Sequence, residues 1–129
     1  MKKKLQGGFT LIELLVVIAI IGILASVVFA SLNTARNKGA DAKIKSELSN
    51  MRAQAEIVYD DDGQSYAAVC SDPTIAAIVS ATASALCNDD TDAYAISAPL
   101  KSDPAKFWCV DSTGAAVENT AALGSATSC

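Results

Sequence analysis

Glu13 is a single acid inside a long apolar stretch of the chain. An ionised carboxylate in apolar surroundings is costly unless a counter-charge or hydrogen bonds compensate it. An acid in the first turns of a helix is also favoured by the positive end of the helix dipole. Glu13 is therefore either a helix-start residue or a charge that needs a partner. The other polar side chains between Phe9 and Leu32 are Thr10, Ser26 and Ser31.

The four cysteines could form disulfides or bind a metal. They are widely spaced and include no C-x-x-C pair, which argues against a zinc site with four cysteine ligands. Four cysteines allow three disulfide pairings. Joining neighbours along the chain would close loops with 16 and 19 intervening residues. Each such bond is worth about 3 kcal/mol in the chain-entropy model. The cysteines are Cys70, Cys87, Cys109 and Cys129.

The chain contains no histidine. This excludes Ser–His and Cys–His catalytic pairs and histidine-based metal sites. It also has no Gly-rich phosphate loop and no recognisable nucleophile motif, so an enzyme is the weakest interpretation and no cofactor is expected. With the lysines at positions 2–4 set aside, seven basic side chains face fourteen acidic ones. Such an acidic balance is unsuited to phosphate contacts, and no nucleic-acid site is evident.

Two groups of acids lie in expected turns: Asp60–Asp62, and the group Asp89, Asp90 and Asp92. A calcium loop of the EF-hand type needs the pattern D-x-D-x-D-G, which three adjacent acids do not match. A solvated turn is the favoured interpretation at both places, and a cation site is the alternative. Gly63 follows the first group and suits a left-handed exit from a helix.

One long helix is predicted from about Thr10 to Tyr59. The stretch from Phe9 to Leu32 is long enough to cross a bilayer as a helix. Beyond it, apolar residues recur at helical spacing among polar ones, which predicts an amphipathic continuation. The first half then needs a bilayer or sister helices around it, and the second half needs a packed domain over one face. The apolar stripe consists of Ile44, Leu48, Met51, Ala55 and Val58.

A small head domain is predicted after the long helix. Asp72 followed by Pro73 is a good helix start, and the pattern favours a short helix over residues 73–86. Strand signals follow at 94–97, 106–110 and 115–118, with a hairpin loop at 111–114. We expect the fold class α+β, with a long N-terminal helix packed by its second half on an antiparallel sheet of about three strands. The adjacent Phe107 and Trp108 would face opposite sides of this sheet, with one of them in the core.

The N-terminal segment resembles that of type IV prepilins. Residues 7–24 read GGFTLIELLVVIAIIGIL and directly follow a cluster of lysines. Glycine, aromatic residue, acid and apolar run coincide in register, and the plan of a long helix and a sheet extends the resemblance over the chain. It implies cleavage after Gly8 by prepilin peptidase and N-methylation of Phe9 by the same enzyme. The lysines also fit a cytoplasmic N-terminus by the positive-inside rule.

The resemblance gives Glu13 a role in assembly. Cleavage would leave a positive amine on Phe9, and Glu13 of one subunit would pair with that amine of a neighbour and fix the axial register of a fibre. Thr10 would assist as a nearby hydrogen-bonding group. Many pilins have a C-terminal region bounded by a disulfide, which matches a Cys109–Cys129 bond. We therefore expect the pairs Cys70–Cys87 and Cys109–Cys129.

These implications describe a single-pass precursor in the cytoplasmic (inner) membrane that becomes part of an extracellular pilus. Its parts would be a leader peptide (1–8), a transmembrane and filament-core half of the helix (9–32), and a periplasmic or extracellular head (33–129). The expected partners are other copies in a homo-oligomeric filament, the prepilin peptidase/methyltransferase, an inner-membrane assembly platform and, before assembly, the membrane. The filament would serve adhesion, motility or DNA uptake.

Two other interpretations are retained. A pseudopilin of a type II secretion system shares this N-terminus, and calcium-dependent stability of the head would favour it. A secreted soluble binding domain with an ordinary signal peptide cut after Ala30 would start at Ser31 and would not require Glu13. Many pilins also have a proline where this chain has Ala30, and the helix between Gly22 and that proline can melt in the fibre. This chain departs from that pattern.

Overall fold

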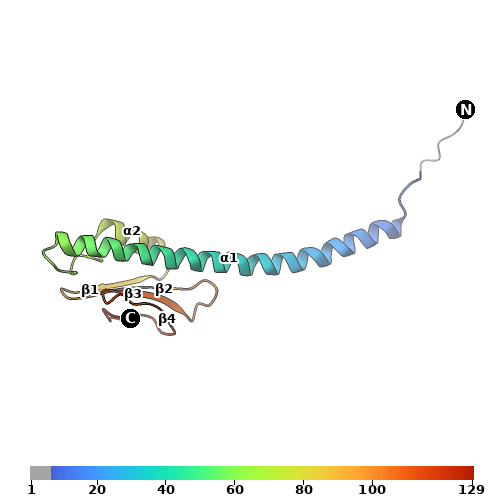
Figure 1. Ribbon diagram of the computed structural model, residues 1–129. Helices are drawn as coiled ribbons and strands as arrows, with labels where there is room; N and C mark the ends of the chain where they lie inside the picture. Colours follow the sequence, from blue (N-terminus) through green and yellow to red (C-terminus); the bar gives the residue numbers. More distant parts are fainter. Residues whose placement is uncertain (1–6) are drawn as a thin grey trace, which may run out of the picture. The chain divides into compact units, whose positions relative to one another are not determined.

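The computed structural model describes residues 7–129, so the lysine cluster and most of the predicted leader lie outside the described residues. The chain divides into two compact units, Met1–Arg36 and Asn37–Cys129. The fold class is α+β, as predicted, with one long helix and a small antiparallel sheet (Figure 1). The elements in chain order are α1 (Leu11–Asp61), α2 (Pro73–Ala81), β1 (Leu86–Asp89), β2 (Tyr94–Pro99), β3 (Phe107–Asp111) and β4 (Ala116–Asn119).

The head part of α1 buries one apolar stripe. Its buried apolar residues are those that the helical spacing predicts, and all have at most 8% of their surface exposed. The helix ends at Asp61, and Gly63 follows with a φ of 69°, the left-handed conformation that glycine adopts without steric cost. The backbone N–H of Gln64 then donates to the carbonyl of Tyr59 at 2.8 Å. The stripe consists of Ile44, Leu48, Met51, Ala55 and Val58.

The sheet has four strands in the order β1-β2-β3-β4, all antiparallel, one more than predicted. The additional strand is β1, and its first residue, Leu86, was assigned by the sequence pattern to the preceding helix. That prediction was wrong because α2 ends at Ala81. Thr82 already has an extended backbone, and Ser84 has a φ of 61°, which no helix accommodates.

The start of α2 agrees with the prediction. Asp72 is the N-cap, and its Oδ1 accepts hydrogen bonds from the backbone N–H groups of Thr74 at 2.9 Å and Ile75 at 3.1 Å. These bonds satisfy two of the donors that a helix start leaves unpaired. Figure 1 shows α2 and the sheet on different sides of the head part of α1.

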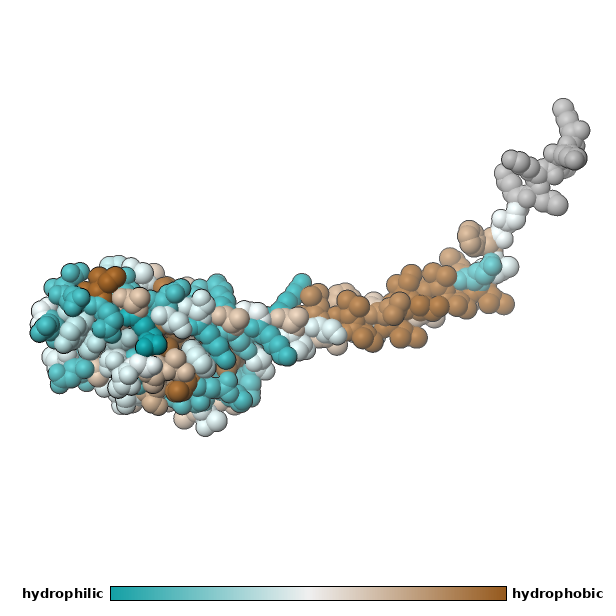
Figure 2. All heavy atoms as spheres, in the orientation of Figure 1, coloured by the Kyte–Doolittle hydropathy of each residue, from teal (hydrophilic) through white to brown (hydrophobic). Residues whose placement is uncertain are grey.

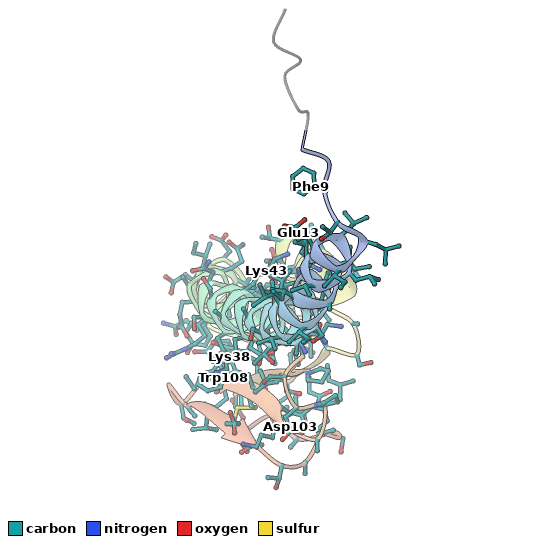
Figure 3. All side chains as sticks on the ribbon, turned by 90° about the vertical axis from the view of Figure 1, so that its right-hand side faces the viewer. Phe9, Glu13, Lys38, Lys43, Asp103 and Trp108 are labelled. Atoms are coloured by element: carbon teal, nitrogen blue, oxygen red, sulfur yellow. A yellow bond between two sulfur atoms is a disulfide. The ribbon has the colours of Figure 1, made fainter. Side chains whose placement is uncertain are left out.

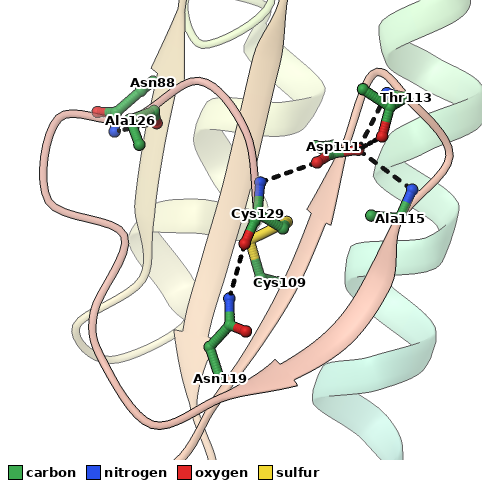
Figure 4. Close-up of a disulfide and its surroundings, with 8 residues drawn as sticks. All are labelled: Asn88, Cys109, Asp111, Thr113, Ala115, Asn119, Ala126 and Cys129. Carbon is green, nitrogen blue, oxygen red and sulfur yellow. Dashed lines mark hydrogen bonds between the residues drawn. A yellow bond between two sulfur atoms is a disulfide. The ribbon is translucent and has the colours of Figure 1, made fainter.

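The sheet is covered on both faces, and each face carries one disulfide. Residues opposite each other on neighbouring strands share a face. Cys87 lies opposite Ile96 of the core, and Cys87 is bonded to Cys70 on the side of the sheet that packs on α1. Cys109 lies opposite Ser97 on the other face, where it is bonded to Cys129 (Figure 4). The C-terminal segment is thereby held over the outer face, where Asn88 also donates to its carbonyl groups.

The adjacent aromatic residues of β3 face opposite sides, as predicted. Trp108 packs against the buried core on the helix side, and the Nζ atom of Lys45 lies 4.4 Å from the centre of its ring. A cation over an indole face is attracted by the ring quadrupole. Phe107 is half-buried on the other face.

Asp111, at the end of β3, is a buried acid that holds the outer face together. Its Oδ1 accepts bonds from the Thr113 hydroxyl and the Ala115 N–H, and its Oδ2 accepts the N–H of Cys129 at 2.8 Å (Figure 4). Burial alone would raise the pKa of Asp111, but the hydrogen bonds from Cys129, Thr113 and Ala115 outweigh it and lower the pKa. The ionised carboxylate is therefore part of the folded head.

Asp41 on α1 is a second buried acid that accepts hydrogen bonds from a distant part of the head. It continues the buried stripe one turn before Ile44, and its carboxylate accepts bonds from the backbone N–H groups of Lys101 and Ser102 and from the Ser102 hydroxyl. Burial raises the pKa of Asp41, and the bonds from Ser102 and Lys101 more than offset this and lower it. Asp41 thus fixes the β2–β3 loop to the helix.

Candidate assembly site at the start of α1

Thr10 and Glu13 form a reciprocal cap at the start of α1. The Oε2 atom of Glu13 accepts hydrogen bonds from the backbone N–H of Thr10 at 2.8 Å and from its hydroxyl at 2.9 Å. The Thr10 hydroxyl in turn accepts the N–H of Glu13 at 3.2 Å. This is the capping box of a T-x-x-E sequence, in which both residues satisfy donors that the helix leaves free. Within one chain, Glu13 is therefore compensated by hydrogen bonds.

Sequence reasoning missed this cap, although the signal was present. Thr10-Leu11-Ile12-Glu13 has the spacing of a capping box. Thr10 was expected to assist a charge pair between subunits, and the structure gives it a role within its own helix. That role alone does not exclude the other one, because both hydrogen bonds from Thr10 reach the same oxygen of Glu13.

The residues before α1 are open to solvent. Gly7, Gly8 and Phe9 precede the helix and are exposed, and Phe9 has 94% of its surface exposed. A side-chain carbon added at Gly7 or Gly8 would meet no atom within 4 Å. Figure 3 shows Phe9 and Glu13 close to the beginning of the helix. The Gly8–Phe9 bond thus lies in an accessible, non-helical segment.

The N-terminal part of α1 exposes apolar surface along its whole length. From Phe9 to Leu32 every side chain is exposed except the partly covered Ala25. Figure 2 shows these apolar side chains gathered over this part of the helix. Monomeric soluble proteins rarely expose contiguous apolar patches above a few hundred Å². By length and composition this part of α1 can cross a membrane.

The backbone and the Ser26 hydroxyl in this apolar part form their hydrogen bonds within the helix. The Ser26 hydroxyl donates to the carbonyl of Ile23 at 2.7 Å, and the backbone bonds remain within the helix. No break occurs at Gly22 or Ala30, because α1 is continuous from Leu11 to Asp61. A helix whose backbone groups are bonded internally suits an apolar environment, either lipid or other helices.

The other candidate groups have local structural roles. The Asp89 carboxylate accepts the N–H of Cys70 at 2.7 Å, and Asp90 accepts those of Asp92 and Ala93 in the β1–β2 turn. Across residues 7–129, the structure places no three or more acidic, cysteine or histidine side chains so that they could hold a metal ion. All four cysteines are in disulfides.

An apolar N-terminal helix joined to a disulfide-bonded α+β head defines a pilin-like architecture. The family model of the prokaryotic N-terminal methylation motif matches residues 3–29. The motif therefore covers the segment before α1 and the greater part of its apolar stretch.

Two type IV pilus proteins are similar to part of this chain. The chain is 43% identical over 54 residues to the type IV major fimbrial protein FimA of Dichelobacter nodosus, a match that covers 42% of this chain and 35% of that protein. It is 46% identical over 59 residues to the type IV wide pilus major component PilA4 of Thermus thermophilus, covering 46% of this chain and 44% of that protein. The chain thus spans less than half the length of these relatives. No solved structure matches the chain. Together, the motif and the relatives support a place in the type IV pilin family.

Proposed function

We propose that this chain is a structural subunit of a type IV pilus filament, made as a membrane-anchored precursor and cut after Gly8 by prepilin peptidase. One observation carries the proposal: the apolar N-terminal part of α1, exposed except at the partly covered Ala25, begins with a Thr10–Glu13 cap directly after an accessible Gly8–Phe9 bond. The names of the relatives, a fimbrial protein and a pilus component, favour a pilus over a secretion pseudopilin.

The exposed helix requires two successive environments under this proposal. Before cleavage, residues 9–32 would span the inner membrane, where lipid covers their apolar side chains. After cleavage, copies of the same helix would cover one another in the filament core. The folded head, from about residue 33 onward, already has its own core and would form the outer surface.

Glu13 would support assembly through Oε1, the carboxylate oxygen that the helix cap does not use. Both bonds from Thr10 go to Oε2, and within residues 7–129 no hydrogen bond to Oε1 is formed. Cleavage would give Phe9 a positive amine, N-methylated by the same enzyme. Oε1 could accept the amine of a neighbouring copy while Oε2 keeps the helix cap. Each charge would then be paired inside an apolar core, where an unpaired charge is strongly unfavourable.

The test is a pair of Glu13 variants in cells that assemble the filament. Glu13→Gln preserves the capping box, because glutamine also serves at this position, but it removes the charge. Glu13→Asp keeps the charge on a shorter side chain. We expect Glu13→Gln to be processed after Gly8 yet to yield at least tenfold fewer filaments, and Glu13→Asp to retain part of the yield.

The outcomes separate the parts of the proposal. Filaments of Glu13→Gln at the wild-type level would show that the charge pair is not used. A wild-type protein that begins at Ser31 would contradict the pilus function altogether and favour a secreted domain. Ser26→Ala is the matched control, because it removes a polar group from the same apolar stretch without touching the cap.

A further inference from the structure

The charges of the head are separated along the chain. Residues 53–100 contain eight acids and no lysine or arginine. Residues 33–52 contain five basic side chains and two acids. The unit Asn37–Cys129 as a whole has six basic and thirteen acidic side chains, a net charge of −7. Copies of such a head repel one another unless opposite charges are brought together where they meet.

The end of α1 concentrates negative charge at an unfavourable place. Asp60, Asp61 and Asp62 are all exposed there, next to the negative end of the helix dipole. Neither ion pair formed within residues 7–129 includes any of them, since these pairs are Lys43–Glu47 and Lys106–Glu118. The acidic β1–β2 turn lies at the same end, because the carbonyl of Thr91 accepts the N–H of Tyr66 just after the helix. Among residues 7–129, this end of α1 therefore has no positive ion-pair partner.

A groove with lysines on its rim lies nearer the start of the head. It has a volume of about 370 Å³ and is formed by α1, the loop after α2, and the β2–β3 loop. The nearly buried Ile44 and Leu100 line it together with the exposed side chains of Lys43 and Lys101. Glu47 lines it too and pairs with Lys43 at 3.6 Å, which leaves Lys101 as the lysine without an ion pair there in the described part of the chain. Figure 3 shows Lys43 on this stretch of α1.

The position of Lys101 is fixed by its backbone. Its N–H donates to the buried carboxylate of Asp41, so the loop is held to α1 while the side chain stays exposed. Lys101 takes part in no ion pair among residues 7–129. The backbone of Lys101 is thus fixed at the groove while its ammonium group forms no ion pair within these residues. This positive charge is complementary to the unpaired acids at the other end of the head.

We propose that this lysine groove binds the acidic end of α1 of a second copy, with Lys101 and Lys43 facing Asp61 and Asp62. This inference rests on the proposed pilus function and names a contact between heads within the filament. The two surfaces are different parts of one chain, so the contact is head-to-tail, and with an axial displacement between copies it extends into an open fibre instead of closing into a ring.

The spacing of the two surfaces makes the contact geometrically specific. Lys43 and Asp61 are 18 positions apart on one helix. At 1.5 Å per residue this corresponds to about 27 Å along the helix axis. Copies joined by the contact, with parallel helices, are therefore displaced by about 27 Å along α1. The contact also relieves the repulsion between acidic helix ends and the helix dipole.

A charge exchange in the full-length chain tests this contact. Lys101→Glu and Asp62→Lys would be introduced singly and together, and filaments sheared from cells would be quantified. We expect each single variant to reduce the filament yield at least fivefold and the double variant to recover most of it. Asp62→Lys places a positive charge at a helix C-terminus, which favours the helix. Its loss of filaments would therefore not reflect a damaged head.

The control changes the net charge by the same amount elsewhere. Ala122→Glu with Ser125→Glu adds two negative charges to exposed positions of the C-terminal segment, as Lys101→Glu does at the groove, and should leave the yield unchanged. Single variants that assemble like the wild type, or a double variant no better than either single one, would overturn the contact. If the wild-type chain formed no filaments at all, the pilus function would be wrong and the contact would fall with it.

Discussion

Leu15 and Leu48 are the same residue type in the same helix, yet their surroundings are opposite. Leu15 has 52% of its surface exposed, and Leu48 has none. Leu48 belongs to a stripe that the sheet and α2 cover, whereas the apolar helix around Leu15 is left exposed by residues 7–129. The head is complete within one polypeptide. Under the proposed function, the N-terminal stretch would acquire its apolar environment from a membrane or from other copies.

The acids of the two regions differ in the same way. Glu13 is compensated by a residue three positions away. Asp41 is compensated by residues 60 and 61 positions away, which exist only in the folded head. The hydrogen bonds of Glu13 come from its own helix turn, so they can persist in different surroundings. The hydrogen bonds of Asp41 come from a distant loop, so they exist only in the folded head.

The largest expected difference comes from shortening each leucine. Leu48→Ala should lower the free energy of unfolding of the head by about 3–5 kcal/mol, because a cavity replaces a fully buried side chain. Leu15→Ala should leave it unchanged within about 0.5 kcal/mol, the range of exposed substitutions. Denaturation of the full chain in detergent, followed by Trp108 fluorescence, measures both. Equal losses would contradict the division between the two regions.

The disulfides should stabilise only the head. Replacing Cys109 and Cys129 by serine should lower its unfolding free energy by about 3 kcal/mol, as expected for a loop of this size. The same change at Cys70 and Cys87 should have a similar effect. Circular dichroism should show that the N-terminal helix in detergent keeps its helicity in both variants. Loss of that helicity would mean that the helix depends on the head.

Acid should also act on the head through Asp111 and Asp41. The folded pKa of each is lowered, so the stability that they contribute is present above the unfolded pKa of about 3.9 and is lost as the pH falls through the folded value. The free energy of unfolding should therefore decline below about pH 4. Asp111→Asn should lower it by about 2 kcal/mol at neutral pH, since bonds to a charged acceptor are lost, and should flatten the decline. An unchanged acid profile in this variant would contradict the role of Asp111.

The smallest expected effect is at the helix cap. Thr10→Ala should destabilise the first turn of α1 by about 1 kcal/mol, because the Glu13 N–H loses its acceptor and Glu13 loses the Thr10 hydroxyl. Hydrogen exchange of the amides of Glu13 and Leu14, measured in detergent, should become faster. Ser26→Ala is the comparison, since its hydroxyl bonds only to a carbonyl that is already in the helix. Similar exchange in both variants would exclude a cap function for Thr10.

The long helix and its buried stripe could be predicted because both follow from the spacing of apolar residues along the sequence. The apolar run has the length of a membrane span, and residues 44–58 repeat every three to four positions. The hairpin between β3 and β4 was equally readable from its glycine-containing link. Chain order alone left three disulfide pairings open, and the resemblance to pilins favoured the two pairs found in the structure.

Other features could not be predicted because they depend on contacts between residues far apart in the sequence. Strand β1 has no alternation of apolar and polar residues, and it exists because β2 offers it a hydrogen-bonded edge. The roles of Asp41 and Asp111 depend on residues brought near by folding. The groove at Lys101 likewise forms only when the β2–β3 loop is held against α1.

The most direct measurement is the intact mass and N-terminal sequence of this protein in filaments sheared from the cell surface. We expect a chain that begins at Phe9 and carries one extra methyl group on its amine. A chain that begins at Ser31, or one recovered only as a soluble secreted domain, would contradict it. In that case the exposed apolar helix would be a discarded export signal rather than the core of a fibre.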